Sequence, residues 1–303
     1  MKSISFISLI LSVFFGLILM ILTTGCETTP TEVEKYEKEA VLTAFLTNGE
    51  PVSEVFLERI ASIFDRYDFS DAAITGADIK IFDLNGSDTL HFQDDPVSHG
   101  RYIPVAGDTL IPLGKHSYRI EASIPNGEFL WSETVVPDAF TSLDIVLIDE
   151  DGTFYPVSSG DTLTRNDPYM FWRWSSVDSA GGYLGLIVAE TPRDSLVPLD
   201  PNWDPNDPDD EIEDENRERS GDMIMRNDAT TVSVPWIFFN WEGPNRIELR
   251  AISHSYYEYK FSLMRVEMGM LENPIFNING GLGIFAGSSK VGMIVYLKRV
   301  EEQ

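Results

Sequence analysis

The chain has 303 residues, of which 43% are hydrophobic and 12% aromatic, a composition that supports a sizeable buried core and excludes wholesale disorder. Its 49 acidic residues outnumber 22 basic residues, which gives a formal net charge of -27 at pH 7. A field of this sign repels phosphate backbones, so we expect no nucleic acid partner.

A long apolar segment opens the chain and ends at its only cysteine. Residues 4–24 are nearly all apolar, and the sequence LTTG directly precedes Cys26. Small residues before a cysteine resemble a bacterial lipobox, in which the leader is removed and the thiol takes a diacylglycerol. We therefore expect residues 1–25 to be a lipoprotein signal peptide, Cys26 to be the lipid attachment site and 26–38 to be a polar tether.

Two alternatives to the lipobox remain open. The apolar segment is long enough to span a bilayer, so it could be an uncleaved transmembrane anchor. It could also be an ordinary signal peptide followed by an incidental cysteine. In every case Cys26 is the only thiol, which excludes intrachain disulfides and thiolate metal clusters.

Short apolar or alternating segments, separated by Asn-Gly and Leu-Gly turn signals, follow the tether. They are AVLTAFL (40–46), VSEVFLE (52–58), DIKIFDL (78–84), YRIEASI (118–124) and LWSETVV (130–136). Regular short strands between turn signals are typical of an all-β sandwich and not of a βαβ protein. We therefore predict an N-terminal β-sandwich over residues 39–140.

The segment PYMFWRWSSVDSAGGYLGLIVAE (168–190) combines an aromatic strand, a polar turn and a second strand. This arrangement resembles the core hairpin of a fibronectin type III domain, one of the immunoglobulin-like sandwiches. We expect Trp172 or Trp174 to fill the core and Tyr183 to begin the partner strand. The resemblance implies a second, fibronectin type III-like sandwich over residues 141–303, with further strands predicted at 143–149 and 246–253.

The last 50 residues contain the one helical pattern of the mature chain. Apolar side chains recur at helical spacing over 256–271, which predicts an amphipathic helix that ends before Pro274. NINGGLGIFAGSS (277–289) is expected to be a tight glycine-rich loop, and VGMIVYLKRV (291–300) a final strand. The loop has neither the GxxxxGK[ST] nor the GxGxxG spacing, so it predicts no phosphate site.

Residues 198–222 are rich in acidic residues and proline, and we expect them to form an exposed, disordered insertion. Carboxylates are the hard oxygen ligands that Ca²⁺ prefers, and five of them are candidate ligands: Asp200, Asp204, Asp207, Asp209 and Asp210. The EF-hand pattern is absent, so a solvated loop is the preferred interpretation over a calcium site. Trp203, in the same insertion, has no obvious core to join and is a candidate ligand contact.

Catalytic motifs are absent from the sequence. No GxSxG elbow or SxxK motif is present, and the four histidines lack HExxH or HxH spacing. Two carboxylates could serve a glycosidase, but 49 acidic residues make any single pair coincidental. We therefore expect a protein that is not an enzyme and holds no obligatory cofactor, and we keep a carbohydrate-active hydrolase as the alternative.

The order of these features resembles a family of uncharacterised Bacteroidetes-type lipoproteins, defined as a domain of unknown function. The resemblance covers residues 26–300 and is carried by the motifs LTNGEPV, ITGADIKIFDLNG, AISHSYYEYKFSL and NPIFNINGGLGIFAGSS. Such proteins are often encoded beside TonB-dependent outer-membrane receptors. The resemblance therefore implies a lipid-anchored binding or accessory protein of the cell outer membrane, in an uptake or assembly complex with such a receptor. A structural adhesin module is the third alternative.

Overall fold

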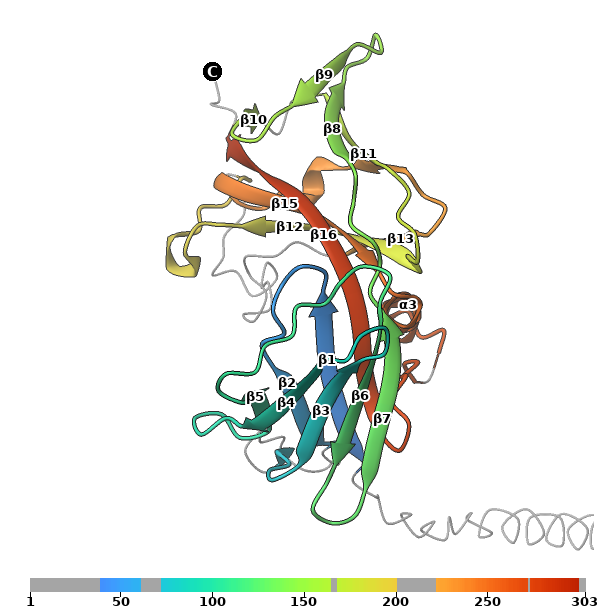
Figure 1. Cartoon of the computed structure of the whole chain (residues 1–303). Helices are drawn as coiled ribbons and strands as arrows, with labels where there is room; N and C mark the ends of the chain where they lie inside the picture. Colours follow the sequence, from blue (N-terminus) through green and yellow to red (C-terminus); the bar gives the residue numbers. More distant parts are fainter. Residues whose placement is uncertain (1–38, 61–71, 165–167, 201–221, 272, 300–303) are drawn as a thin grey trace, which may run out of the picture. The chain divides into compact units, whose positions relative to one another are not determined.

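The computed structural model describes residues 39–60, 72–164, 168–200, 222–271 and 273–299 (Figure 1). Residues Glu39–Gln303 form one compact unit. The described part is mainly β, with two sheets packed as in a sandwich and a helix near the C-terminus, which confirms the predicted fold class. The predicted domain boundary near residue 140 stays a prediction.

The first half of the chain contributes strands to one large sheet. These strands are β1 (Ala40–Thr47), β2 (Val55–Arg59), β3 (Asp78–Asp83), β4 (Thr89–Asp94), β5 (Arg101–Pro104), β6 (Ser117–Ser123) and β7 (Phe129–Val135). Each of the five segments predicted in this half overlaps one of them, because alternation of apolar and polar residues marks a strand with one buried face.

The second half extends the large sheet and builds a smaller one. The large sheet takes in β10 (Thr162–Thr164), β12 (Gly182–Ala189), β13 (Met223–Arg226), β15 (Gly243–Ile252) and β16 (Leu282–Lys298). Its order is β13-β12-β15-β16-β1-β2-β5-β4-β3-β6-β7, and β10 pairs with β16 outside this path. The four-stranded sheet has the order β14-β11-β8-β9 and consists of β8 (Leu143–Ile148), β9 (Phe154–Val157), β11 (Tyr169–Trp174) and β14 (Thr231–Val234). Two 3₁₀ turns, η1 (Arg193–Ser195) and η4 (Trp236–Phe238), lie in the connections.

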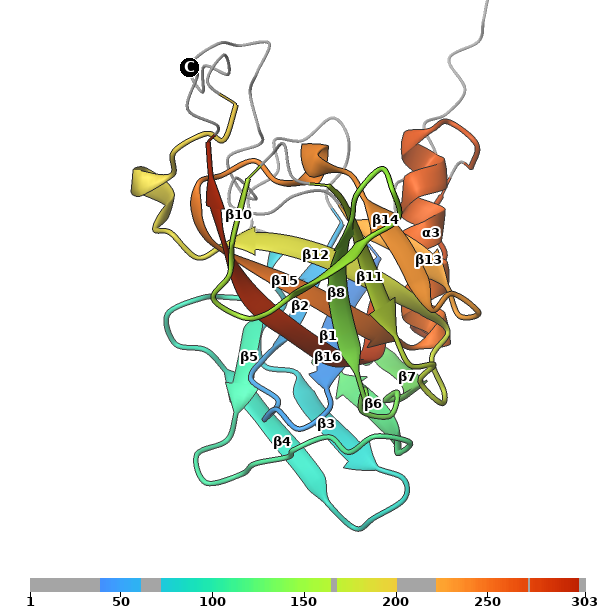
Figure 2. The same cartoon turned by 90° about the horizontal axis from the view of Figure 1, so that it is seen from above.

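The four-stranded sheet packs on β12, β15 and β16 through a core rich in aromatic side chains. Figure 2 shows β8 and β11 lying across β12 and β15, and the side chains of both sheets form one buried cluster. Trp172 is fully buried in it, and Gly185 on β12 makes room, since a Cβ there would lie 2.8 Å from the indole ring. Trp174 and Tyr183 are buried as well, which confirms their predicted places in the core. The predicted hairpin is wrong, because β11 and β12 belong to different sheets and do not pair with each other.

The first half has its own buried cluster, in which Tyr102 is a polar member. The Tyr102 hydroxyl donates to the Ile74 carbonyl at 2.9 Å and accepts from the Ala77 N–H at 3.1 Å. Burial raises the pKa of Tyr102 to about 12, so the phenol stays neutral at physiological pH and can make both bonds. These bonds tie the segment before β3 to β5.

The helix α3 (His254–Glu267) lies beside β16 in Figure 1 and covers one face of the large sheet. Tyr256 is buried on that face with Ile252 and Ile284, as helical spacing predicted. The helix ends four residues before the predicted end, because Gly269 adopts a left-handed conformation with φ +70 and the chain turns there. No helix among the described residues is long and apolar enough to cross a bilayer.

The predicted loop over 277–289 is wrong, because most of this segment is the first half of β16. Leu282 to Ser288 pair with β1 in parallel, and the strand continues to Lys298. The glycines allow a backbone approach that larger residues would prevent: a Cβ on Gly283 would lie 2.1 Å from the Leu42 carbonyl oxygen. Glycine therefore marks close packing here and not a turn.

Replacing Gly283 by alanine tests this interpretation against a matched control. Gly107 also has a positive φ, +97 against +110, but no atom lies within 4 Å of its would-be Cβ. Gly107→Ala should lower the free energy of unfolding by about 1–3 kcal/mol through backbone strain alone. Gly283→Ala should lower the free energy of unfolding by about 1–3 kcal/mol more than Gly107→Ala does, because its methyl group meets backbone atoms of β1. Urea denaturation measures both, and equal losses would contradict the packing role.

Candidate functional site

The outer face of the four-stranded sheet carries exposed aromatic side chains on β9 and β11, beside the polar Thr231 and Ser233 of β14. The strand register places alternate residues of β8, β9 and β11 on the side opposite Trp172. We call these residues the outer face: Asp144, Val146, Ile148, Phe154, Pro156, Tyr169, Phe171 and Arg173.

The residues of the outer face differ in exposure: Val146 in its centre is buried, and the aromatic side chains around it are exposed. Val146 is only 8% exposed, whereas Phe154 is 52% and Tyr169 is 69% exposed. Isolated exposed apolar side chains are common on proteins, but contiguous apolar patches mark interaction surfaces. The clustering of the aromatic residues on one sheet face thus indicates a binding surface.

Arg173 gives the outer face a fixed polar element. Its guanidinium carbon lies 4.7 Å from the centroid of the Phe154 ring, a cation–π arrangement. The contact holds an arginine and an aromatic ring in one geometry before any partner arrives. Arginine, tyrosine and phenylalanine are the residue types enriched in the centres of protein interfaces.

An acidic turn borders the outer face between β8 and β9. Asp149 accepts hydrogen bonds from the Tyr155 hydroxyl at 2.9 Å and from the backbone N–H of Thr153 at 3.1 Å. The hydrogen bond to Asp149 raises the pKa of Tyr155, so this tyrosine remains a neutral donor. With Glu150 and Asp151, the turn places negative charge at the rim of the aromatic surface.

The neighbouring sheet edge is less suited to binding than the face. β9 is an edge strand, and Pro156 within it has no N–H to donate to an added strand. Proline on an edge strand is a known device against edge-to-edge pairing. A partner is therefore expected to cover the side chains of the outer face and not to extend the sheet.

Most of the residues predicted as functional from the sequence lie outside the described residues. This applies to Cys26, Asp204, Asp207, Asp209, Asp210 and Trp203. Asp200 is described and half-buried, two residues after Pro198, which forms a bridge with Trp241. Among the described residues, no group of three or more histidine, cysteine or acidic side chains could hold a metal ion. The calcium and ligand-contact predictions stay predictions.

The sequence contains a signal for the outer face that alternation of apolar and polar residues does not include. Every residue from Tyr169 to Trp174 except Arg173 is apolar or aromatic, so β11 has apolar side chains on both faces. A strand that is apolar on both faces needs cover on both sides. Only one of these faces is covered by the large sheet.

Comparisons with known proteins identify the family. Residues 27–292 match the model of a family described as "Domain of unknown function (DUF4249)". No curated protein matches the chain in sequence. A crystal structure of the FN1–FN3 domains of chicken CNTN1 is similar at 9% identity and a TM-score of 0.25, covering 86% of this chain and 65% of that chain. Because the family match spans most of its length, the chain belongs to the DUF4249 family.

Proposed function

We propose that this chain is a lipid-anchored accessory protein of the cell outer membrane that binds a protein partner through the outer face. The observation that carries the proposal is the exposure of Tyr169 and Phe154 beside Arg173 on a regular sheet. The proposed partner is a TonB-dependent outer-membrane receptor of an uptake or assembly complex. Its complementary surface would have an apolar centre and a basic rim, because the acidic turn borders the outer face.

The lipid anchor would hold the folded unit beside such a partner. In the proposal, Cys26 carries the lipid and residues 26–38 form the tether before β1 begins at Ala40. A tether of this length reaches at most about 43–47 Å when fully extended. Tethering raises the effective concentration of the unit at the membrane, so a modest affinity of the outer face would suffice.

The buried carboxylates favour binding over hydrolysis. A glycosidase needs two carboxyl groups that face a substrate. Among the described residues, the buried acidic side chains are Asp83, Asp95 and Glu248, and each contacts a basic side chain. In Asp95, a backbone hydrogen bond from Val97 and the charge of Arg101 keep the pKa below its ordinary value. Asp95 therefore acts as a structural anion that holds Arg101.

The proposal predicts that exposed aromatic residues contribute little to stability. Phe154→Ser with Tyr169→Ser should lower the free energy of unfolding by less than about 1.5 kcal/mol, since these rings lose mainly one cation–π contact. Trp172→Ala, on the buried face of β11, should lower the free energy of unfolding by about 3–5 kcal/mol. Urea denaturation compares them. A loss in the double variant as large as that of Trp172→Ala would show that the outer face is part of the core.

Partner binding is tested with the same double variant in the native host. The full chain is purified from detergent-solubilised membranes, and co-purifying proteins are identified by mass spectrometry. We expect a TonB-dependent receptor to co-purify with the unchanged chain and to be reduced at least tenfold with Phe154→Ser and Tyr169→Ser. Val97→Ser, which changes a residue that is 90% exposed elsewhere, is the control and should retain the receptor. Equal recovery with all three chains would contradict binding through the outer face.

The membrane anchor has its own test. Cys26→Ser removes the thiol that lipidation requires, so the chain should move from the membrane fraction to the soluble fraction and lose labelling by a radioactive fatty acid. Thr24→Ser, which keeps a small residue before the cysteine, should stay in the membrane fraction. A Cys26→Ser chain that remains in the membrane would support the uncleaved transmembrane anchor.

A further inference from the structure

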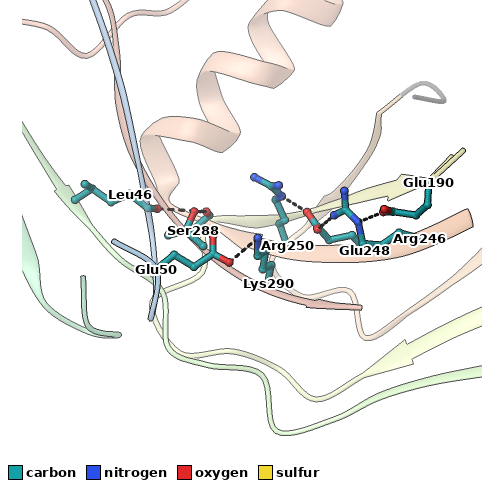
Figure 3. A network of polar contacts seen from close by, with 9 residues as sticks. Leu46, Glu50, Glu190, Arg246, Glu248, Arg250, Ser288 and Lys290 are labelled. Carbon is teal, nitrogen blue, oxygen red and sulfur yellow. Dashed lines mark hydrogen bonds and ion pairs between the residues drawn. The ribbon is translucent and has the colours of Figure 1, made fainter. Parts of the chain in front are cut away.

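A line of charged side chains crosses the large sheet on the face opposite the four-stranded sheet. Figure 3 shows Lys290 and Arg250 next to each other, between Glu50 on one side and Glu248 on the other. Arg250 of β15 and Lys290 of β16 are register partners, so both side chains leave the same face. Like charges directly opposite each other on neighbouring strands repel, so this pair is unfavourable by itself.

The neighbouring acids relieve only part of this repulsion. Arg250 Nε donates to Glu248 Oε1 at 2.5 Å, and Lys290 Nζ lies 2.7 Å from Glu50 Oε1. Glu248 is shared, because its other oxygen accepts a hydrogen bond from Arg246 Nη1.

The far end of the line is closed by a strong ion pair. Arg246 Nε donates to Glu190 Oε1 at 2.6 Å. Burial opposes the charge of Arg246, but the hydrogen bond to Glu190 and the charge of Glu248 outweigh it, so the pKa of Arg246 lies above its ordinary value. Arg246 therefore stays bound to both Glu190 and Glu248, and Arg250 shares its carboxylate partner Glu248 with Arg246.

Arg250 and Lys290 retain donors that the protein does not use. Among the described residues, no acceptor lies on the two terminal nitrogens of Arg250, and Lys290 has Glu50 as its single acidic partner. The Arg250 side chain is 28% exposed and that of Lys290 is 33% exposed, so both are largely covered but can still be reached from solvent. The terminal nitrogens of Arg250 are not among the buried polar atoms without a partner, so their unused N–H groups face solvent, where a ligand acceptor can replace water.

We propose that Arg250 and Lys290 form a binding site for a ligand carboxylate. The two terminal nitrogens of Arg250 offer the planar fork that matches two carboxylate oxygens, and Lys290 supplies a second positive charge beside it. The ligand charge selects carboxylate over phosphate. Because the protein carries a net charge of -27, a group with one negative charge meets less repulsion than a phosphate with nearly two.

The test measures acetate binding to the full chain in detergent micelles by saturation-transfer NMR, with the ionic strength held constant by chloride. The unchanged chain should bind acetate saturably. Inorganic phosphate is then added as a competitor of bound acetate, and its affinity should be lower than that of acetate. Arg250→Gln should weaken acetate binding at least tenfold, and Lys290→Gln should weaken it severalfold. Lys298→Gln, at an exposed position on the same strand, is the matched control and should change nothing.

A second variant of Arg250 distinguishes the contribution of the planar guanidinium group from that of its positive charge. Arg250→Lys keeps the positive charge and should still lose most of the affinity, because an ammonium group cannot pair with two oxygens at once. This variant also decides the question if Arg250→Gln does not fold, as judged by circular dichroism. Absence of saturable acetate binding, unchanged affinity in both Arg250 variants, or tighter binding of phosphate would each overturn the proposal.

Discussion

The structure depends on the close approach of other backbones to the first half of β16. Its even-numbered side chains Ile284 and Ala286 pack under α3. Its odd-numbered side chains pack into the core of the first half near the start of the strand, and into the core between the two sheets near its end. Phe285 belongs to the core of the first half, and Val295 belongs to the core of the sandwich. Between them, the chain that leaves β7 crosses β16, where a Cβ on Gly287 would lie 2.6 Å from the Val135 carbonyl oxygen. One strand thus serves both cores only because this crossing has no side chain.

The crossing also fixes the surfaces that carry the proposals. Ser289 next to it donates to the Pro137 carbonyl at 2.7 Å, which secures the segment leading from β7 to β8. β8 is the strand that pairs with β11 in the four-stranded sheet. The outer face is therefore built on regular strands whose far sides are packed by Trp172, and not on loops. Binding residues on rigid elements keep their geometry without a partner, which reduces the entropy lost on binding.

The amino-acid sequence predicts the local parts of this fold well and its long-range parts poorly. Alternation in segments such as DIKIFDL reflects one buried face, and the aromatic strand around Trp172 reflects a buried core. The parallel pairing of β1 with β16 joins residues about 240 positions apart, and no local pattern contains it. The glycines of 280–287 favour a turn when considered locally, but here they serve close contact between backbones. The outer face was missed for a related reason: alternation finds a strand with one buried face, and β11 is apolar on both.

The two proposed sites lie on opposite sides of the sandwich, so they are independent in the first instance. The outer face points away from Trp172, whereas Arg250 leaves the face of β15 opposite the buried Leu249. An occupant of one site cannot cover the other, and the packed core between them has no described polar chain that connects the two. Close-packed cores respond to binding by discrete rearrangement and not by gradual deformation. Coupling between a partner and a carboxylate ligand would thus require a shift of the four-stranded sheet on β12 and β15, where Trp172 packs so close to Gly185 that a Cβ there would lie 2.8 Å from its ring. The simplest arrangement is a protein held by the outer face, with Arg250 and Lys290 accessible to a small anionic ligand on the sheet face that α3 partly covers.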